Sequence, residues 1–253
     1  ARQALLSAAL ALTQSLELSS LHMLFASDVD MDAAAAQGLM ARQTVQFHWN
    51  NRTPAYRDFD DFLQSLNQDK RKKIRQEQRK VSEAGVRFRW ARGAGISAAD
   101  WAFFQRCYER TYLEHGNPPY LKPPFFEAMA REMPEHWLMF VAENAAGAPI
   151  ASSLIALSDG GPSPRVAYGR YWGALERVDC LHFEACYHQP LQWCVAHGVG
   201  RFEGGAQGEH KMARALMPAQ TRSAHWLAHP DFADAVERFL DEEDRHVERY
   251  LAH

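Results

Sequence analysis

QTVQFHW at residues 43–49 and QTRSAHW at residues 220–226 are two versions of one segment, 177 residues apart. The match continues upstream at the same spacing without a gap. The identical pairs are Phe25 and Phe202, Ala36 and Ala213, Leu39 and Leu216, Met40 and Met217, Gln43 and Gln220, Thr44 and Thr221, His48 and His225, and Trp49 and Trp226. Because this spacing is far longer than a solenoid period, the repeated unit is a domain. The sequence therefore predicts two copies of one fold.

The two copies are not represented equally in this chain. The second copy has a long stretch before its matching segment, whereas the equivalent stretch of the first copy would precede Ala1. We therefore expect the first domain to be incomplete here. The predicted organisation is the C-terminal part of a first domain at 1–57, a basic linking helix at 58–85 and a complete second domain at 86–253.

The composition is that of a globular protein, with 47% hydrophobic and 23% charged residues. The longest apolar run, residues 4–12, is shorter than the roughly 20 residues of a membrane span, and no signal peptide is expected. The cysteines form no CxxC pair, which favours reduced thiols and a cytoplasmic location. No ligand set has a zinc-like spacing, so we expect no metal. The net charge of −3 argues against a generally nucleic-acid-binding surface.

The order of predicted elements indicates an α/β (α+β) fold. Helices are expected at 4–18, 58–84, 98–114, 125–132, 181–197 and 209–216, and strands at 21–25, 41–50, 137–143, 149–158, 165–172 and 201–203. The turns Asn144–Gly147 and Asp159–Pro162 are typical of antiparallel neighbours, so three strands form a meander. A helix then crosses to a further strand. We therefore expect tandem domains built on a mixed sheet with crossing helices.

One stretch of the linking helix is strongly basic. Its cations are Lys70, Arg71, Lys72, Lys73, Arg75, Arg79 and Lys80. A solvated helix that bridges two domains is the first interpretation, because charge runs are usually solvated faces. A surface that contacts the phosphates of a nucleotide or a tRNA is the alternative. Base stacking is not indicated, since few aromatic residues lie among the cations.

Four motifs between Tyr168 and Trp226 carry a resemblance to a known family. They are GRYWG at 169–173, LHFEACY at 181–187, GAQGEHK at 205–211 and SAHW at 223–226. The chain resembles the FemAB-like family, named for peptidoglycan biosynthesis or recognition, within the GNAT acyltransferase superfamily. The resemblance implies tandem GNAT-like domains and transfer of an acyl or aminoacyl group to an amine, such as that of a peptidoglycan precursor. A non-catalytic GNAT-fold protein that binds a cell-wall precursor or peptide is the alternative.

Acyl transfer by direct attack requires a base for the attacking ammonium, donors for the oxyanion and an acid for the leaving group. Candidates for these catalytic roles are Glu203, Glu209, His210 and Lys211, which flank a glycine-rich segment. Their counterparts in the first copy are Ala26, Asp32, Ala33 and Ala34. The His and Lys occur only in the second copy, which indicates that this copy carries the site. A structural ion-pair cluster at a helix N-terminus is the alternative.

Further residues are candidates for substrate binding. Tyr168, Arg170 and Trp172 alternate along one strand, either as half-buried sheet or as the wall of a binding site. Glu184 is a possible partner of Glu203 as acid and base, and Arg214 is expected near the mouth of the pocket. The substrate-binding candidates are therefore Tyr168, Arg170, Trp172, Glu184 and Arg214. His48 and His225 recur in both copies, so a shared structural role is expected for them.

The acyl donor is the open question. GNAT domains that use acetyl-CoA carry Gln or Arg and then Gly-x-Gly or Gly-x-Ala after the fourth strand, where backbone N–H groups hold the pyrophosphate. Residues 173–180 read GALERVDC, and the signature is absent. This departure weakens the case for acyl-CoA and leaves aminoacyl-tRNA, the donor of better-known FemAB transferases, or another activated acyl group as the donor. The acidic net charge weighs against tRNA as a partner.

Overall fold

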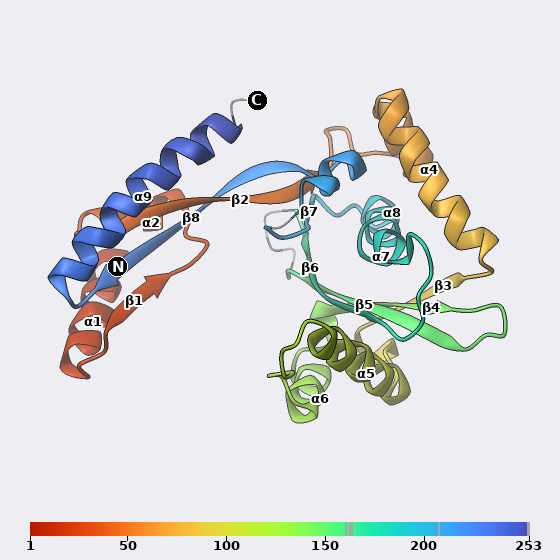
Figure 1. Cartoon of the computed structure of the whole chain (residues 1–253), viewed down its shortest axis with the longest axis horizontal. Helices are drawn as coiled ribbons and strands as arrows, with labels where there is room; N and C mark the ends of the chain where they lie inside the picture. The colour runs from red at the N-terminus through yellow and green to blue at the C-terminus, as the bar shows by residue number, and fades with distance from the viewer. Residues whose placement is uncertain (160, 162–163, 207, 252–253) are drawn as a thin grey trace. The chain divides into compact units, whose positions relative to one another are not determined.

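A computed structural model describes residues 1–159, 161, 164–206 and 208–251 (Figure 1). The α-helices are α1 Arg2–Ser15, α2 Asp28–Ala35, α3 Phe59–Ser65, α4 Gln68–Glu83, α5 Ala98–Glu114, α6 Pro123–Glu132, α7 Leu181–Phe183, α8 Gln189–Ala196 and α9 Pro230–Leu251. The strands are β1 Ser20–Met23, β2 Met40–Asn50, β3 Arg87–Arg92, β4 Trp137–Glu143, β5 Pro149–Leu157, β6 Val166–Ala174, β7 Arg201–Glu203 and β8 Met217–Leu227. Gly160 and Pro162 of a predicted turn and Gln207 of the glycine-rich segment lie outside the described residues.

The duplication is visible in the order of the elements. In the first copy a helix, a short strand, a second helix and a long strand follow one another as α1, β1, α2 and β2. In the second copy the order is α7 with α8, β7, a 3-10 helix at Glu209–Arg214 and β8. Both ends of β8 lie 177 residues after the ends of β2. The predicted tandem fold with a mixed sheet and crossing helices is confirmed.

The long strands of the two copies exchange partners. β8 pairs antiparallel with β1, and β2 pairs antiparallel with β7. β2 and β8 are also neighbours, and the Thr44 Oγ1 atom lies 2.8 Å from the Oγ1 atom of Thr221, its counterpart in the repeat. Pairing of a residue with its own counterpart is what a two-fold relation between the two strands requires.

The exchange divides the chain into two compact units. Unit 1 consists of residues 1–46 and 218–253, and unit 2 of residues 47–217. These units follow spatial contacts, whereas the boundaries predicted from the sequence, at 57 and 85, follow the duplication and stay a prediction. The two divisions differ because the last long strand returns to β1 of the first copy.

Unit 2 is built on a mixed sheet with helices on both faces (Figure 1). The strand order from the end of β2 is β2-β7-β6-β5-β4-β3. Strands β3 to β6 form an antiparallel meander, and β7 joins β6 in parallel after the crossing helix. Helices α5 and α6 pack Phe104, Tyr108 and Phe126 against one face. Val81 of α4 and Leu181 of α7 belong to the apolar cluster on the other.

Glycine makes the contact between α5 and β6 possible. A Cβ atom on Gly173 would lie 1.9 Å from the carbonyl oxygen of Cys107, so no side chain fits between the strand and the helix. Helix α5 itself begins with a capping box, in which Ser97 and Asp100 each bind the other's backbone N–H. These local features hold the helix close to the strand that carries the candidate site.

Unit 1 has a smaller core. Leu10, Ala34, Leu39 and Ala224 form a buried cluster to which α1, α2 and β8 contribute. On the surface of this unit, Arg42 of β2 forms a salt bridge with Glu243 of α9 at 2.7 Å. Within the described part of the chain, none of the helices is both long enough and apolar enough for a membrane span.

Most predicted elements agree with the structure to within a few residues, but the predicted helix at 58–84 is two helices. Leu66 is extended, and the Asn67 side chain accepts a hydrogen bond from the backbone N–H of Lys70 at 2.9 Å. This cap starts a new helix, α4, because it satisfies an N–H group that a continuous helix would have paired internally. The apolar periodicity continues across the break, and the prediction of a single helix rested on it.

Candidate functional site

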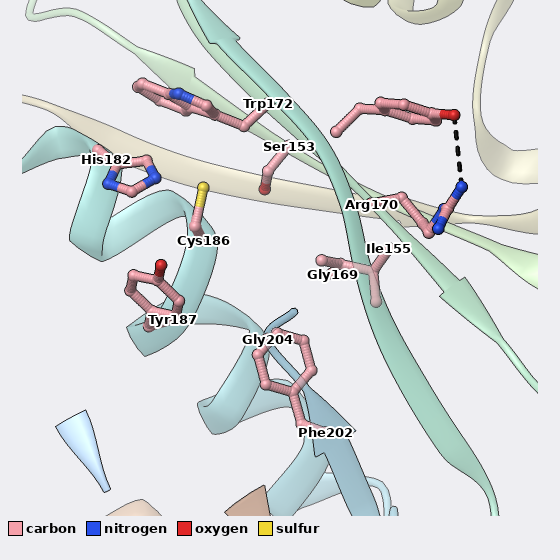
Figure 2. A pocket seen from close by; sticks show the side chains of 11 residues that line it. Ser153, Ile155, Gly169, Arg170, Trp172, His182, Cys186, Tyr187, Phe202 and Gly204 are labelled. Atoms are coloured by element: carbon pink, nitrogen blue, oxygen red, sulfur yellow. Dashed lines mark hydrogen bonds between the residues drawn. The ribbon is translucent and has the colours of Figure 1, made fainter. Parts of the chain in front are cut away.

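A cavity lies where β6 and β7 diverge. β7 pairs only with the first residues of β6, Val166 to Tyr168, while β6 continues to Ala174. Beside the second half of β6 is a cavity of about 160 Å³. Its described lining consists of Ser153, Ile155, Gly169, Arg170, Tyr171, Trp172, His182, Cys186, Tyr187, Phe202 and Gly204 (Figure 2). The volume suits one small group of a substrate rather than a whole ligand.

A larger hollow adjoins this cavity. It has a volume of about 390 Å³ and shares Trp172 and His182 with the smaller one. The rings of these two residues lie 5.0 Å apart and form the common wall. Arg110 and Arg177 supply cationic groups, Glu114 and Glu176 supply carboxylates, and Leu175 and Leu181 supply apolar surface. A ligand in the larger hollow therefore has one end next to His182.

A β-bulge shapes the β6 side of the cavity. Leu154 of β5 pairs with Tyr171 and Ile155 pairs with Gly169, so Arg170 is the extra residue. An extra residue breaks the two-residue alternation of a strand. Gly169, Arg170, Tyr171 and Trp172 consequently all line the cavity, and Arg170 extends away from His182 toward the Tyr171 hydroxyl (Figure 2).

A π-helical turn shapes the opposite side. Residues Glu184–His188 form this turn between α7 and α8. Pro190, early in α8, has no N–H group and cannot donate to the carbonyl of Cys186 four residues earlier, which favours a wider turn. The Ser153 hydroxyl of β5 donates to the Ala185 carbonyl at 2.6 Å and fastens the turn to the sheet. The turn and α7 together present His182, Cys186 and Tyr187 to the cavity (Figure 2).

The side chains of this wall are electrically neutral near pH 7. Burial lowers the pKa of His182 to about 4, helped by the charges of His210, Arg214 and Lys211. Burial raises the pKa of the Cys186 thiol and of the Tyr187 hydroxyl above their usual values. His182 is therefore unprotonated near pH 7 and Tyr187 keeps its proton, while the same shifts make His182 a weaker base and Tyr187 a weaker acid than in water.

None of the four predicted catalytic residues belongs to the described lining of the cavity. His210 is the one in contact with it, since its Nε2 atom lies 3.4 Å from the Tyr187 hydroxyl. The buried Lys211 donates to the Gly205 carbonyl at 3.3 Å, and burial lowers its pKa. Glu203 accepts a hydrogen bond from Arg201 at 2.8 Å, and burial raises its pKa. Glu209 is exposed. The structure therefore brings His210 to Tyr187 and keeps the charge of Lys211 near His182 and Cys186, whereas Glu203 and Glu209 lie in other surroundings.

Two of the five predicted substrate-binding residues line the cavity, and three lie outside its described lining. Arg170 and Trp172 line the cavity, whereas Tyr168 lies in the part of β6 that pairs with β7. Glu184 and Arg214 are buried. Glu184 accepts a hydrogen bond from Gln189 at 2.6 Å, and its pKa is raised by burial. We expected Arg214 near the mouth of the pocket. In the structure its buried side chain instead forms a salt bridge with Glu77.

His182 and Tyr187 were not predicted as site residues. The sequence places His182 and Cys186 four residues apart on a predicted helix, a spacing that by itself indicates neither a metal site nor a catalytic site. Among the described residues, no group of three or more His, Cys, Asp and Glu side chains could hold a metal ion. The useful signal was Pro190 directly after LHFEACYHQ, because a proline near the start of a helical turn indicates altered backbone pairing.

Comparisons with known proteins identify the family of the chain. A model of the FemAB-like family, described as peptidoglycan biosynthesis/recognition, matches residues 1–253. No curated protein matches the chain.

Solved structures are similar in fold at low identity. The C-terminal domain of a putative lysylphosphatidylglycerol synthetase from Agrobacterium fabrum has a TM-score of 0.65 and 10% identity, covering 91% of this chain and 74% of that one. FemX has a TM-score of 0.59 and 9% identity, covering 92% and 78%. A tandem GNAT protein from the clavulanic acid pathway has a TM-score of 0.51 and 13% identity, covering 90% and 70%.

Proposed function

This chain belongs to the FemAB-like family, and we propose that it transfers an acyl or aminoacyl group to an amine. The observation that carries the proposal is a neutral imidazole and a protonated phenol on one wall of a small cavity. His182 and Tyr187 are these groups, and both line the cavity beside the second half of β6 (Figure 2). Direct acyl transfer needs one group that accepts a proton and one that donates a proton.

In the proposed reaction the amine attacks the carbonyl carbon of the donor. The new C–N bond forms while His182 accepts the proton that the amine loses. The bond from the carbonyl carbon to the leaving group then breaks, and Tyr187 donates its proton to that leaving group. His210 is exposed to solvent and within hydrogen-bond distance of the Tyr187 hydroxyl, so it can return a proton to Tyr187. No covalent enzyme intermediate is required.

The two adjoining hollows support separate binding places for the acyl or aminoacyl group and for the rest of the donor molecule. The cavity of about 160 Å³ fits an acyl or aminoacyl group, and the hollow of about 390 Å³ fits part of the molecule that carries it. Positioning both reactants against one wall lowers the entropic part of the barrier. Trp172 and His182 belong to both hollows, which supports a reacting bond beside them.

We propose an aminoacyl-tRNA rather than acyl-CoA as the donor. The segment after β6 has no glycine-rich pyrophosphate signature. We expect acetyl-CoA to bind with a dissociation constant no tighter than about 1 mM, which corresponds to roughly −4 kcal/mol. Isothermal titration calorimetry checks this value. Micromolar binding of acetyl-CoA would restore acyl-CoA as the donor.

We propose a peptidoglycan precursor peptide as the acceptor, in keeping with the family description. One similar structure is named for lysylphosphatidylglycerol synthesis, so a phospholipid is the alternative acceptor to test. The assay combines the purified chain with charged tRNAs and either a UDP-linked muramyl pentapeptide or phosphatidylglycerol vesicles. Mass spectrometry of each acceptor detects the added aminoacyl group.

Two variants test the assigned roles. His182→Gln and Tyr187→Phe are each expected to lower kcat/KM by about 10²–10⁴ with little change in Tm, the usual contribution of a general acid or base. His115→Gln is the control, because His115 is exposed at the end of α5 and is not part of the described cavity lining. Unchanged turnover in both active-site variants would remove these residues from the mechanism. The same assay with Glu203→Gln, Glu209→Gln and Lys211→Ala tests the residues predicted from the sequence.

Recognition without reaction is the second candidate function. The surroundings of Glu203 and Glu209 favour it, because neither side chain belongs to the described lining of the cavity. Binding of the muramyl pentapeptide with no product from any charged tRNA would support this function and contradict the transferase proposal.

A further inference from the structure

A buried carboxylate on the linking helix lies behind the candidate site. Glu77 of α4 is 2% exposed and faces the interior of unit 2 together with Ile74 and Val81. Burial acts to raise its pKa, but hydrogen bonds from His188 and Arg214 and the charge of Arg214 hold the pKa below its usual value. The carboxylate is therefore ionised and compensated by its partners.

Glu77 binds the two segments that carry Tyr187 and His210. Its Oε2 atom accepts hydrogen bonds from His188 Nε2 at 3.0 Å and from Arg214 Nε at 3.1 Å. Its Oε1 atom accepts a further bond from Arg214 Nη2. His188 belongs to the π-helical turn that presents Tyr187, and Arg214 ends the 3-10 helix that contains His210.

Arg214 transmits this contact to His210. Its Nη1 atom donates to the carbonyl oxygen of His210, and its guanidinium lies 3.6 Å from the centroid of the Phe183 ring. Both Arg214 and His188 are fully enclosed, with 3% and 0% exposure. A planar guanidinium fixed by a bidentate contact and an aromatic face has one orientation, so the backbone at His210 is fixed as well.

We infer that Glu77 is a positioning residue that sets the spacing between Tyr187 and His210. This inference rests on the proposed function for its catalytic consequence, but the geometric part stands without it. The linking helix thus contributes to the site through the one carboxylate on its buried face, in addition to carrying a basic outer surface. A buried ion pair that only stabilises the fold is the alternative explanation.

The geometric test uses NMR and needs no transferase assay. The rings of Tyr187 and His210 have centroids 6.1 Å apart, so protons on them are expected to show a nuclear Overhauser effect. Glu77→Gln keeps the shape of the side chain but lacks the charge and one acceptor oxygen. We expect the Tyr187–His210 effect to be lost in this variant and retained in Glu83→Gln, a control on the exposed end of the same helix. An unchanged effect in a folded Glu77→Gln protein would overturn the inference.

A double variant separates positioning from stability. Glu77→Leu with Arg214→Met replaces both charges by apolar groups of similar size, which often restores stability lost in a single variant. We expect Tm to recover toward the wild-type value while the Tyr187–His210 effect stays absent. If Tm and the Tyr187–His210 nuclear Overhauser effect both recovered, stability alone would account for the distance between these two rings, and the inference would be overturned. If Glu77→Gln does not fold, Arg214→Lys keeps the charge without the bidentate contact and takes its place.

With a transferase assay in hand, Glu77→Gln is expected to lower kcat about 10-fold to 100-fold with KM changed less than about 3-fold. Glu83→Gln should leave both unchanged. A kcat of wild-type size in a variant that has lost the Tyr187–His210 effect would remove His210 from the mechanism but leave the positioning role of Glu77 intact. A wild-type kcat with that effect retained would contradict the positioning role.

Discussion

Helix α2 of the first copy and the 3-10 helix at Glu209–Arg214 of the second occupy the same place in the repeat, yet their chemistry differs. Each follows a short strand and leads into a long one. Ala33 and Ala34 are buried in α2, whereas their counterparts are His210 and Lys211. The repeat therefore keeps the packing residues of the long strands in both copies, and places titratable side chains near a cavity in only one.

The largest difference is expected for the two repeated tryptophans. Trp49 is 2% exposed and packs its ring against Tyr56 and Phe62, whereas Trp226 is only partly buried. Trp49→Ala should lower the free energy of unfolding by about 3–5 kcal/mol, and Trp226→Ala by roughly half as much. Urea denaturation followed by circular dichroism measures both. Equal losses would mean that the two strands are packed alike and would weaken the comparison.

Exchange of side chains between the copies is the next test. Ala34 is 0% exposed, so Ala34→Lys forces a charged side chain into a packed core. The free energy of unfolding should fall by about 3 kcal/mol. Lys211→Ala removes the donor to the Gly205 carbonyl and should cost only about 1 kcal/mol. Similar costs at both positions would show that the copies tolerate the same side chains.

The sequence alone identified the features that repeat or alternate. The repeated Gln-Thr and His-Trp residues located the two long strands. In the structure the bounds of β2 and β8 are 177 residues apart, which is also the spacing of the repeated residues. The exchange of strand partners could not be predicted, because β1 and β8 lie far apart in sequence and pairing is decided by long-range packing.

The site was less predictable than the fold. The bulge at Arg170 and the π-helical turn at Glu184–His188 decide which side chains face the cavity. Both insert one residue into a regular period, so a pattern analysis that assumes a constant period assigns later residues to the wrong face. Glu77 was not predicted because it lies in a run of basic residues, and its partners belong to other elements that are distant in the sequence.

The repeated histidines differ in their response to pH. Burial lowers the pKa of His48 to about 4, with a contribution from the charge of Arg201. With an unfolded value near 6.5, its stabilising effect is complete above pH 6.5 and is lost as the pH falls toward 4. His48→Gln should therefore reduce the loss of unfolding free energy between pH 7.5 and pH 4.5 by about 2.5 kcal/mol.

His225 provides the matched comparison. Its pKa is also lowered by burial and by the charges of His22 and Arg42, and its Nδ1 atom lies 2.8 Å from that of His22. Because His225 is more exposed than His48, His225→Gln should reduce the pH dependence less. Denaturation curves at the two pH values measure both variants. An equal effect would mean that the surroundings of the two histidines are equivalent.

The smallest effect is expected for Thr44 and Thr221, two counterparts that contact each other between β2 and β8. Thr44 and Thr221 share one hydrogen bond between their hydroxyl groups. Thr44→Val and Thr221→Val should each lower the free energy of unfolding by about 1 kcal/mol. The double variant should lose less than the sum, because each single variant already removes the shared bond. Strict additivity would mean that the two hydroxyls act independently.

The return of β8 to β1 has a consequence for biosynthesis. Unit 1 is assembled from two segments that are separated in the chain by the whole of unit 2. During synthesis residues 1–46 are made before residues 47–217, but β1 cannot pair until β8 has been made, whereas residues 47–217 form a continuous unit that can fold earlier. Until then the edge of β1 and the apolar side chains of α1 stay without their final partners. We therefore expect residues 1–46 to need protection by chaperones for longer during synthesis than residues 47–217 do.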